Sequence, residues 1–184
     1  MSPSDRTFLV MALTTFAVVA AVVAWTSPLA RRIWAPAALA LLLASGAVAA
    51  TVGPEVAIGD GQWILIVSLG GLLAIAGGGP LTALIFDLVD RREAAADSLD
   101  RAGHVLRGGA WIGALERAAI FATLVAGWPE GLAVVLAVKG LGRYPELRAA
   151  EDGVRTGAAE RFIIGTFASV LWACGCAGVV VMLG

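Results

Sequence analysis

Histidine, cysteine and charged residues are scarce in this sequence of 184 residues. It has one histidine, His104, two cysteines, Cys174 and Cys176, and only 15% charged residues. These leave little material for a transition-metal site or a disulfide framework, so we expect no metal and no cofactor. Polybasic arms are also missing, which argues against nucleic acid as a partner. No nucleophile with its base and no metal-holding pair of carboxylates can be found, so the sequence does not predict an enzyme.

Apolar residues, in contrast, make up 59% of the chain, compared with about 45–50% in a soluble domain. This composition predicts an all-α fold, a polytopic bundle of transmembrane helices that forms a single membrane domain over residues 1–184. A spanning helix needs about 20 mostly apolar residues. Six segments approach that length, approximately 7–25, 34–52, 63–87, 109–128, 130–142 and 159–183. Because the fifth segment is short, five spans plus a re-entrant piece is the alternative.

The positions of basic and aromatic residues predict the orientation in the membrane. Short cytoplasmic loops are enriched in Lys and Arg, and the loops after the first, third and fifth segments carry most of the arginines. We therefore expect both termini outside, in the cytoplasmic (inner) membrane of a bacterium. Most tryptophans, such as Trp25, fall at predicted span ends, as an interfacial belt requires. Trp172 is the exception, because it lies in mid-span.

Two further segments bear on the topology. The first apolar run is longer than the core of a signal peptide, so we expect it to be retained as a span. Residues 91–108 form the second cytoplasmic loop and alternate in charge. They predict a short amphipathic helix that rests on the bundle or on the membrane surface.

A proline and three glycines interrupt the third segment. Gly77, Gly78, Gly79 and Pro80 combine low helix propensity with one missing backbone donor in an otherwise apolar stretch. We expect a kink or a helix break at this point. Transporters use such breaks to coordinate substrates or ions, whereas a kink or a close helix crossing is the purely structural alternative.

Three charged residues interrupt apolar segments in the C-terminal half, namely Glu116, Arg117 and Lys139. An ionised group at membrane depth is costly, so it persists only when it is paired, hydrated or used. Segments 109–128 and 130–142 form an antiparallel hairpin with a very short turn, which brings Glu116 close to Lys139. We expect these two side chains to pair and Arg117 to extend toward the inner headgroups.

Asp87, Glu160 and Arg161 lie near the same predicted interface and are expected to complete a polar layer. Asp87 is one residue that Arg117 could meet there. Three roles compete for this layer: pairing that fixes the register of the helices, a route for ions or protons, or a site that faces lipid phosphates.

Three motifs in the C-terminal half are similar to those of another protein family. They are Gly-Ala-Leu-Glu-Arg at 113–117, Ala-Val-Lys at 137–139 followed by Arg-Tyr-Pro-Glu at 143–146, and Glu-Arg-Phe-Ile-Ile-Gly-Thr at 160–166. In this order they resemble an uncharacterised family of bacterial polytopic membrane proteins, over residues 109–172 only. Arg161 stands where that pattern has an aromatic residue. The resemblance implies one shared site or network, made of Gly113, Glu116, Arg117, Lys139, Arg143, Glu146, Glu160, Gly165 and Thr166.

The sequence favours a transport-type or ion-coupled membrane protein whose charged network is built around Glu116 and Lys139. The alternative is a non-catalytic subunit of a larger membrane complex, and an enzyme acting on lipid headgroups comes third. The expected partners are the lipid bilayer and either another membrane protein or a second copy of the chain.

Overall fold

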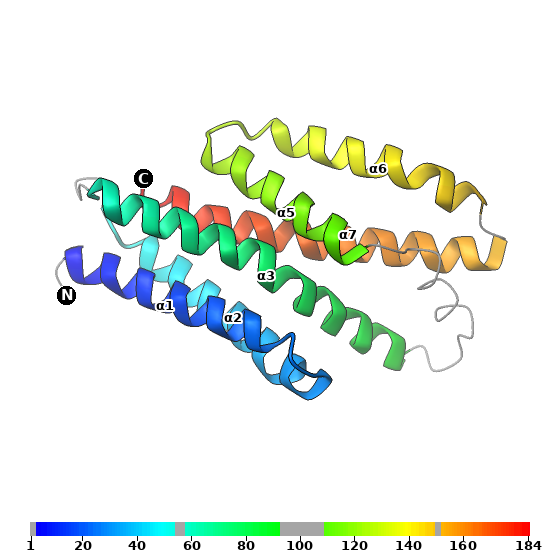
Figure 1. Ribbon diagram of the computed structural model, residues 1–184, viewed down its shortest axis with the longest axis horizontal. Coiled ribbons are helices and arrows are strands. Elements are labelled where there is room, and N and C mark those ends of the chain that lie inside the picture. Colours follow the sequence, from blue (N-terminus) through cyan, green and yellow to red (C-terminus); the bar gives the residue numbers. More distant parts are fainter. Residues whose placement is uncertain (1–2, 54–57, 93–108, 150–151) are drawn as a thin grey trace.

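The computed structural model describes residues 3–53, 58–92, 109–149 and 152–184, and within them every regular element is an α-helix (Figure 1). The helices are α1 (Pro3–Val23), α2 (Pro28–Ala49), α3 (Asp60–Arg92), α5 (Gly109–Val125), α6 (Gly131–Ala149) and α7 (Asp152–Val181). The prediction of an all-helical protein is therefore confirmed. Residues 93–108, which hold most of the expected amphipathic helix, lie outside the described residues.

The helices run up and down beside one another, and the two chain ends lie at the same end of the bundle (Figure 1). α3 and α7 occupy the centre, because they pack against each other and both also contact α2 and α5. α6 lies on the outside and contacts α5 and, less extensively, α7. Figure 1 also shows α3 and α7 spreading apart toward the ends that carry Arg92 and Asp152.

Four helices are long and apolar enough to cross a membrane, judged by length and composition. They are Ser4–Val23, Pro28–Ala49, Asp60–Val89 and Ala159–Val181. α5 has 17 residues, and α6 carries several charged residues among its 19. The apolar character of the chain thus gives a helical bundle with four strong candidate spans.

Several helices extend beyond the predicted apolar segments. α2 begins at Pro28, where the Ser27 hydroxyl caps the N-terminus by accepting from the Ala30 amide at 3.1 Å. α6 continues past residue 142 and through Pro145 to Ala149, and α7 begins at Asp152 instead of residue 159. These helices run beyond the predicted spans because hydropathy marks only the apolar part of a helix, whereas Arg and Glu in the flanks are good helix formers. The candidate span within α7, Ala159–Val181, begins where the sequence predicts it.

Small residues bring α3 and α7 into close contact. Ala74 on α3 and Ala173 on α7 are fully buried, and a β-carbon at Gly70 would lie 2.7 Å from Val180 Cγ2. Such contacts let helices associate where lipid provides no hydrophobic drive. A similar run of alanines on α5 behaves differently, because Ala110 and Ala122 are exposed.

The turn between α5 and α6 has the geometry of a Schellman motif. Gly127 adopts a φ of 73°, the Gly127 amide donates to Leu124 O at 3.1 Å, and the Trp128 amide donates to Thr123 O at 2.8 Å. A glycine in this left-handed position ends a helix without steric cost. The chain therefore reverses over a few residues and sets α6 antiparallel to α5, as the sequence of this turn predicts.

α3 does not break at the glycine triplet, because it is one continuous helix from Asp60 to Arg92 with Pro80 inside it. Of the kink or break expected here, the break is therefore absent. Each glycine instead leaves room for one large side chain from another helix or turn: Gly77 for Trp172, Gly78 for Arg117 and Gly79 for Trp25. A β-carbon at any of the three would approach that side chain to less than 3.0 Å.

The triplet leads to a prediction about stability. We expect Gly77→Ala to lower the free energy of unfolding by about 1–3 kcal/mol, because the Trp172 ring must move. The matched control is Gly178→Ala on α7, where no atom lies within 4 Å of the new methyl group. That variant should be neutral or gain up to about 1 kcal/mol from helix propensity. Unfolding in detergent, followed by circular dichroism, measures both; equal effects would contradict the packing described here.

Candidate functional site

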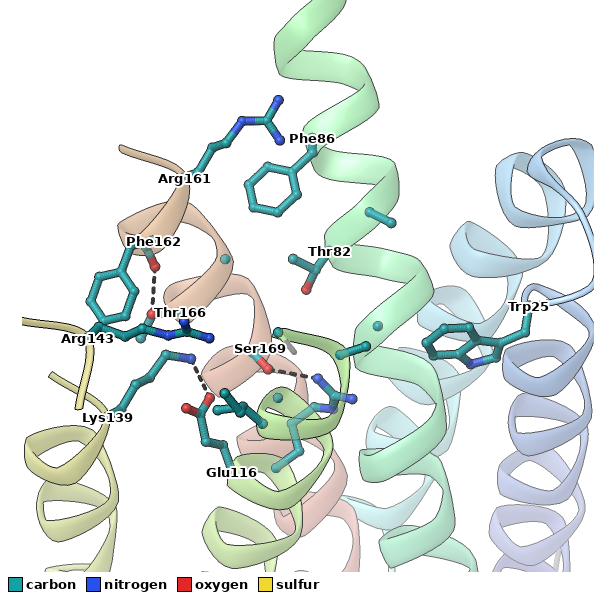
Figure 2. Close-up of a pocket in the computed structure, with 18 residues that line it drawn as sticks. Trp25, Thr82, Phe86, Glu116, Lys139, Arg143, Arg161, Phe162, Thr166 and Ser169 are labelled. Atoms are coloured by element: carbon teal, nitrogen blue, oxygen red, sulfur yellow. Dashed lines mark hydrogen bonds and ion pairs between the residues drawn. The ribbon is translucent and has the colours of Figure 1, made fainter. Parts of the chain in front are cut away.

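A cavity of about 370 Å³ lies where α3 and α7 spread apart, and residues of α5 and α6 complete its wall (Figure 2). Its ionisable lining residues are Arg117, Lys139, Arg143, Arg161 and Glu116. Among the described residues, four cations thus face a single carboxylate. The remaining lining includes Thr82, Thr166 and Ser169, whose hydroxyls can donate or accept hydrogen bonds.

Pro80 follows Gly79, a lining residue of the cavity on α3, and removes a backbone donor from that helix. A regular helix would join the carbonyl of Ala76 to the amide of residue 80, which proline lacks. The indole Nε1 of Trp25, in the turn after α1, donates to Ala76 O at 2.8 Å instead. Trp25 was expected to serve only as an interfacial residue, so its role in satisfying α3 was missed.

Arg117 lies inside the protein with 4% of its surface exposed. Its Nε donates to Ala74 O at 2.9 Å, and its Nη2 donates to Ile75 O at 2.8 Å. Its Nη1 donates to Ser169 Oγ at 3.1 Å, which ties α5 to α7 as well. The prediction that Arg117 extends to the headgroups is therefore wrong, because the carbonyls of α3 and the Ser169 hydroxyl are nearer acceptors.

Trp172 completes this arrangement from α7. It is almost fully buried, and its Nε1 donates to Leu73 O at 3.0 Å. Four consecutive carbonyls of α3, from residue 73 to residue 76, thus accept donors from the rest of the bundle. A carbonyl oxygen has two lone pairs, so it can accept a side-chain donor in addition to a helical one. The mid-span position of Trp172, opposite a glycine triplet, was the available signal for this contact.

Glu116 on α5 and Lys139 on α6 form an ion pair within the cavity wall. Their side chains are 12% and 14% exposed, respectively. The Lys139 ammonium also lies 5.7 Å from the centre of the Phe162 ring, within range of a cation–π interaction. The pair uses Glu116 Oε2, whereas the buried Oε1 has no hydrogen-bond partner among the described residues.

Two further arginines face the same space. Arg143 is buried, and Figure 2 shows its side chain reaching from α6 past Thr166 toward the middle of the cavity. Arg161 stands above it beside Phe86, with the guanidinium carbon 5.1 Å from the ring centre. Stacking on an aromatic ring leaves the edge of a guanidinium directed at other partners. The cationic groups therefore line the cavity from its middle to its rim.

Two residues of the expected polar layer lie elsewhere. Asp87 pairs with Arg31 at the start of α2, at 3.0 Å between Oδ2 and Nη2, and not with Arg117. Glu160 is exposed on α7 and does not line the cavity. Arg31 was missed because the sequence suggested a loop at its position, whereas the early start of α2 brings it beside the C-terminal half of α3.

The uncharged residues of the three motifs contribute mainly to the shape of the cavity. Gly113 and Gly165 both line the cavity; a β-carbon at Gly113 would lie 3.0 Å from Arg117 Nη1, and one at Gly165 would lie 3.1 Å from Phe86 Cζ. Thr166 also lines it and donates to Phe162 O at 2.6 Å. Glu146 belongs to α6, but its side chain lies outside the described residues.

Comparison with known proteins adds no assignment. No protein-family model matches this chain, and no curated protein or solved structure gives a significant match. The resemblance of residues 109–172 to an uncharacterised membrane-protein family stays a prediction. Within the described residues, no three His, Cys, Asp or Glu side chains gather in a way that could hold a metal ion.

The ion pair leads to a prediction that distinguishes mutual stabilisation of Glu116 and Lys139 from separate effects of the two charges. Removing one partner of a buried pair leaves an uncompensated charge and costs about 3–5 kcal/mol when burial is complete. We expect Glu116→Gln and Lys139→Met each to lower the free energy of unfolding by somewhat less, since both groups keep some exposure. The double variant should recover at least half of that loss. If the two losses simply add in detergent unfolding experiments, Glu116 and Lys139 do not form a mutually stabilising pair.

Proposed function

We propose that this chain is a six-span protein of the bacterial inner membrane with both termini outside. At about 1.5 Å per residue, the 17 residues of α5 and the 19 of α6 approach the thickness of a bilayer core, about 30 Å. The two chain ends lie at one end of the bundle, as an even number of crossings requires (Figure 1). The starts of α2 and α7 and the C-terminal part of α6 lie toward the other end (Figure 1). These parts of α2 and α6 carry Arg31 and Arg143, and we assign this end to the cytoplasm.

Labelling of introduced cysteines tests this topology. In a chain whose own Cys174 and Cys176 are replaced by alanine, Glu130→Cys should react with a membrane-impermeant maleimide added to intact cells. Thr26→Cys, in the turn between α1 and α2, should react only after the membrane is permeabilised. The reverse pattern would contradict the orientation, and labelling of both sites from outside would contradict the number of spans.

Within this topology, we propose that the protein is of the transport type and ion-coupled, and that its solute carries an anionic group. The observation that carries it is the cavity itself, where Arg117, Lys139, Arg143 and Arg161 face one carboxylate. Guanidinium groups bind carboxylate and phosphate oxygens through paired hydrogen bonds. Clefts lined by charge of one sign also concentrate ligands of the opposite sign.

Glu116 supports the coupling part of the proposal. Its Oε2 holds Lys139, while its buried Oε1 has no hydrogen-bond partner among the described residues. A carboxylate beside bases in a low-dielectric site is a common proton carrier in transporters. A change of charge at Glu116 would act directly on Lys139, its partner in the ion pair. Proton and anion occupancy would then be linked through this single residue.

Removing the charges tests the function. In liposomes that hold a pH-sensitive dye, we expect the protein to produce a pH change when a gradient of inorganic phosphate, the probe anion, is applied. Glu116→Gln and Lys139→Met should abolish that change, whereas Arg32→Gln, an exposed arginine on α2, should keep it. Size-exclusion profiles and circular dichroism report whether each variant is folded. Absence of flux in the natural protein, or unchanged flux in both folded variants, would contradict the proposal.

A further inference from the structure

A second hollow, of about 410 Å³, lies between α5 and α6. Its wall is apolar apart from Glu116, Lys139 and Arg143, and its apolar residues include Leu115, Val134 and Val138. These three apolar side chains are also largely exposed on the surface of the bundle. The hollow is therefore an apolar groove on the face that α5 and α6 would present to lipid.

The groove and the cation-lined cavity share one wall. Ile112, Glu116, Lys139 and Arg143 line both. A molecule that occupied both spaces would thus place its charged part among the arginines and its apolar part between α5 and α6, with Lys139 and Arg143 at the junction. Volumes of about 300–1,000 Å³ are typical of ligand sites, and both spaces reach that size.

We propose that the natural ligand of this bipartite site is a phospholipid with an anionic headgroup. The headgroup phosphate would lie in the cavity against Arg143, and one acyl chain would lie in the groove against Val138. The inference rests on the proposed function in one respect, namely that the cavity accepts an anionic group. It goes further by assigning that group to a lipid and giving the chain its own place.

Physical chemistry decides which part of the lipid carries the selectivity. An acyl chain gains little when it moves from the bilayer into an apolar groove, because both surroundings are equally apolar. Discrimination among lipids therefore comes from the headgroup, where Arg and Lys form charge-assisted hydrogen bonds with phosphate oxygens. The groove contributes alignment, since it holds the chain where the attached head reaches Arg143. Zwitterionic lipids of the same chain length should bind more weakly because their own cation opposes the arginines.

Native mass spectrometry of the whole protein in detergent tests the proposal, with phosphatidic acid and phosphatidylcholine of matched chains as probes. We expect phosphatidic acid to be retained about tenfold more strongly, as the loss of one charge-assisted hydrogen bond would suggest. Arg143→Gln and Val138→Trp should each lower that retention about tenfold, the first by removing charge and the second by filling the groove. The matched controls are Arg32→Gln and Val22→Trp, a substitution on the exposed face of α1; both should retain phosphatidic acid like the natural chain.

The other outcomes separate the two proposals. In a second measurement, inorganic phosphate is tested for its effect on the thermal stability of the protein. If phosphate stabilises the natural chain but not Arg143→Gln, while Val138→Trp retains lipid like the natural chain, the lipid assignment is wrong and the anion cavity stands. If Arg143→Gln changes neither the stabilisation by phosphate nor the retention of either lipid, both the lipid assignment and the anion cavity are wrong. Should Arg143→Gln fail to fold, Arg161→Gln at the rim of the cavity replaces it in every comparison.

Discussion

Side chains from outside α3 donate hydrogen bonds to its carbonyls at residues 73 to 76, and the rest of the bundle is arranged around these bonds. Trp172 binds the first carbonyl, Arg117 the next two and Trp25 the last, which has lost its helical donor to Pro80. Unsatisfied backbone groups are expensive in lipid. The glycine triplet that follows makes these bonds sterically accessible, because each glycine leaves space for one donor side chain.

This constraint also explains how a charged cavity persists in so apolar a chain. Arg117 donates hydrogen bonds from three of its nitrogens to two carbonyls of α3 and to the Ser169 hydroxyl on α7. Its charge is therefore stabilised by neutral dipoles and not by an ion pair with a carboxylate. Glu116 is thereby left to pair with Lys139, on the side of α5 that faces α6. Adjacent residues on one helix thus serve two different purposes. Arg117 holds the bundle together, and Glu116 faces the space in which a ligand would lie.

Much of this could be predicted from the sequence, and the reasons for the remainder are physical. Apolar segment lengths predict the helices, and the short turn at Gly127 predicts that Glu116 and Lys139 meet. The destinations of long side chains could not be predicted, because Arg117 and Trp25 reach several alternative acceptors from their backbone positions. The glycines and Pro80 marked the correct place on α3. Of the alternatives expected there, the break is absent because α3 is continuous, and side chains from three other parts of the chain pack closely against the glycines.

A double-mutant cycle between Trp25 and Pro80 tests the central claim most directly. Trp25→Phe removes the donor to Ala76, and Pro80→Ala restores the helical donor that Ala76 lacks. If the indole replaces the missing amide, Trp25→Phe should cost about 1–3 kcal/mol in the natural chain and markedly less in the Pro80→Ala background, with a coupling of at least about 0.5 kcal/mol. An equal cost in both backgrounds would contradict the claim that outside donors sustain α3 through its proline.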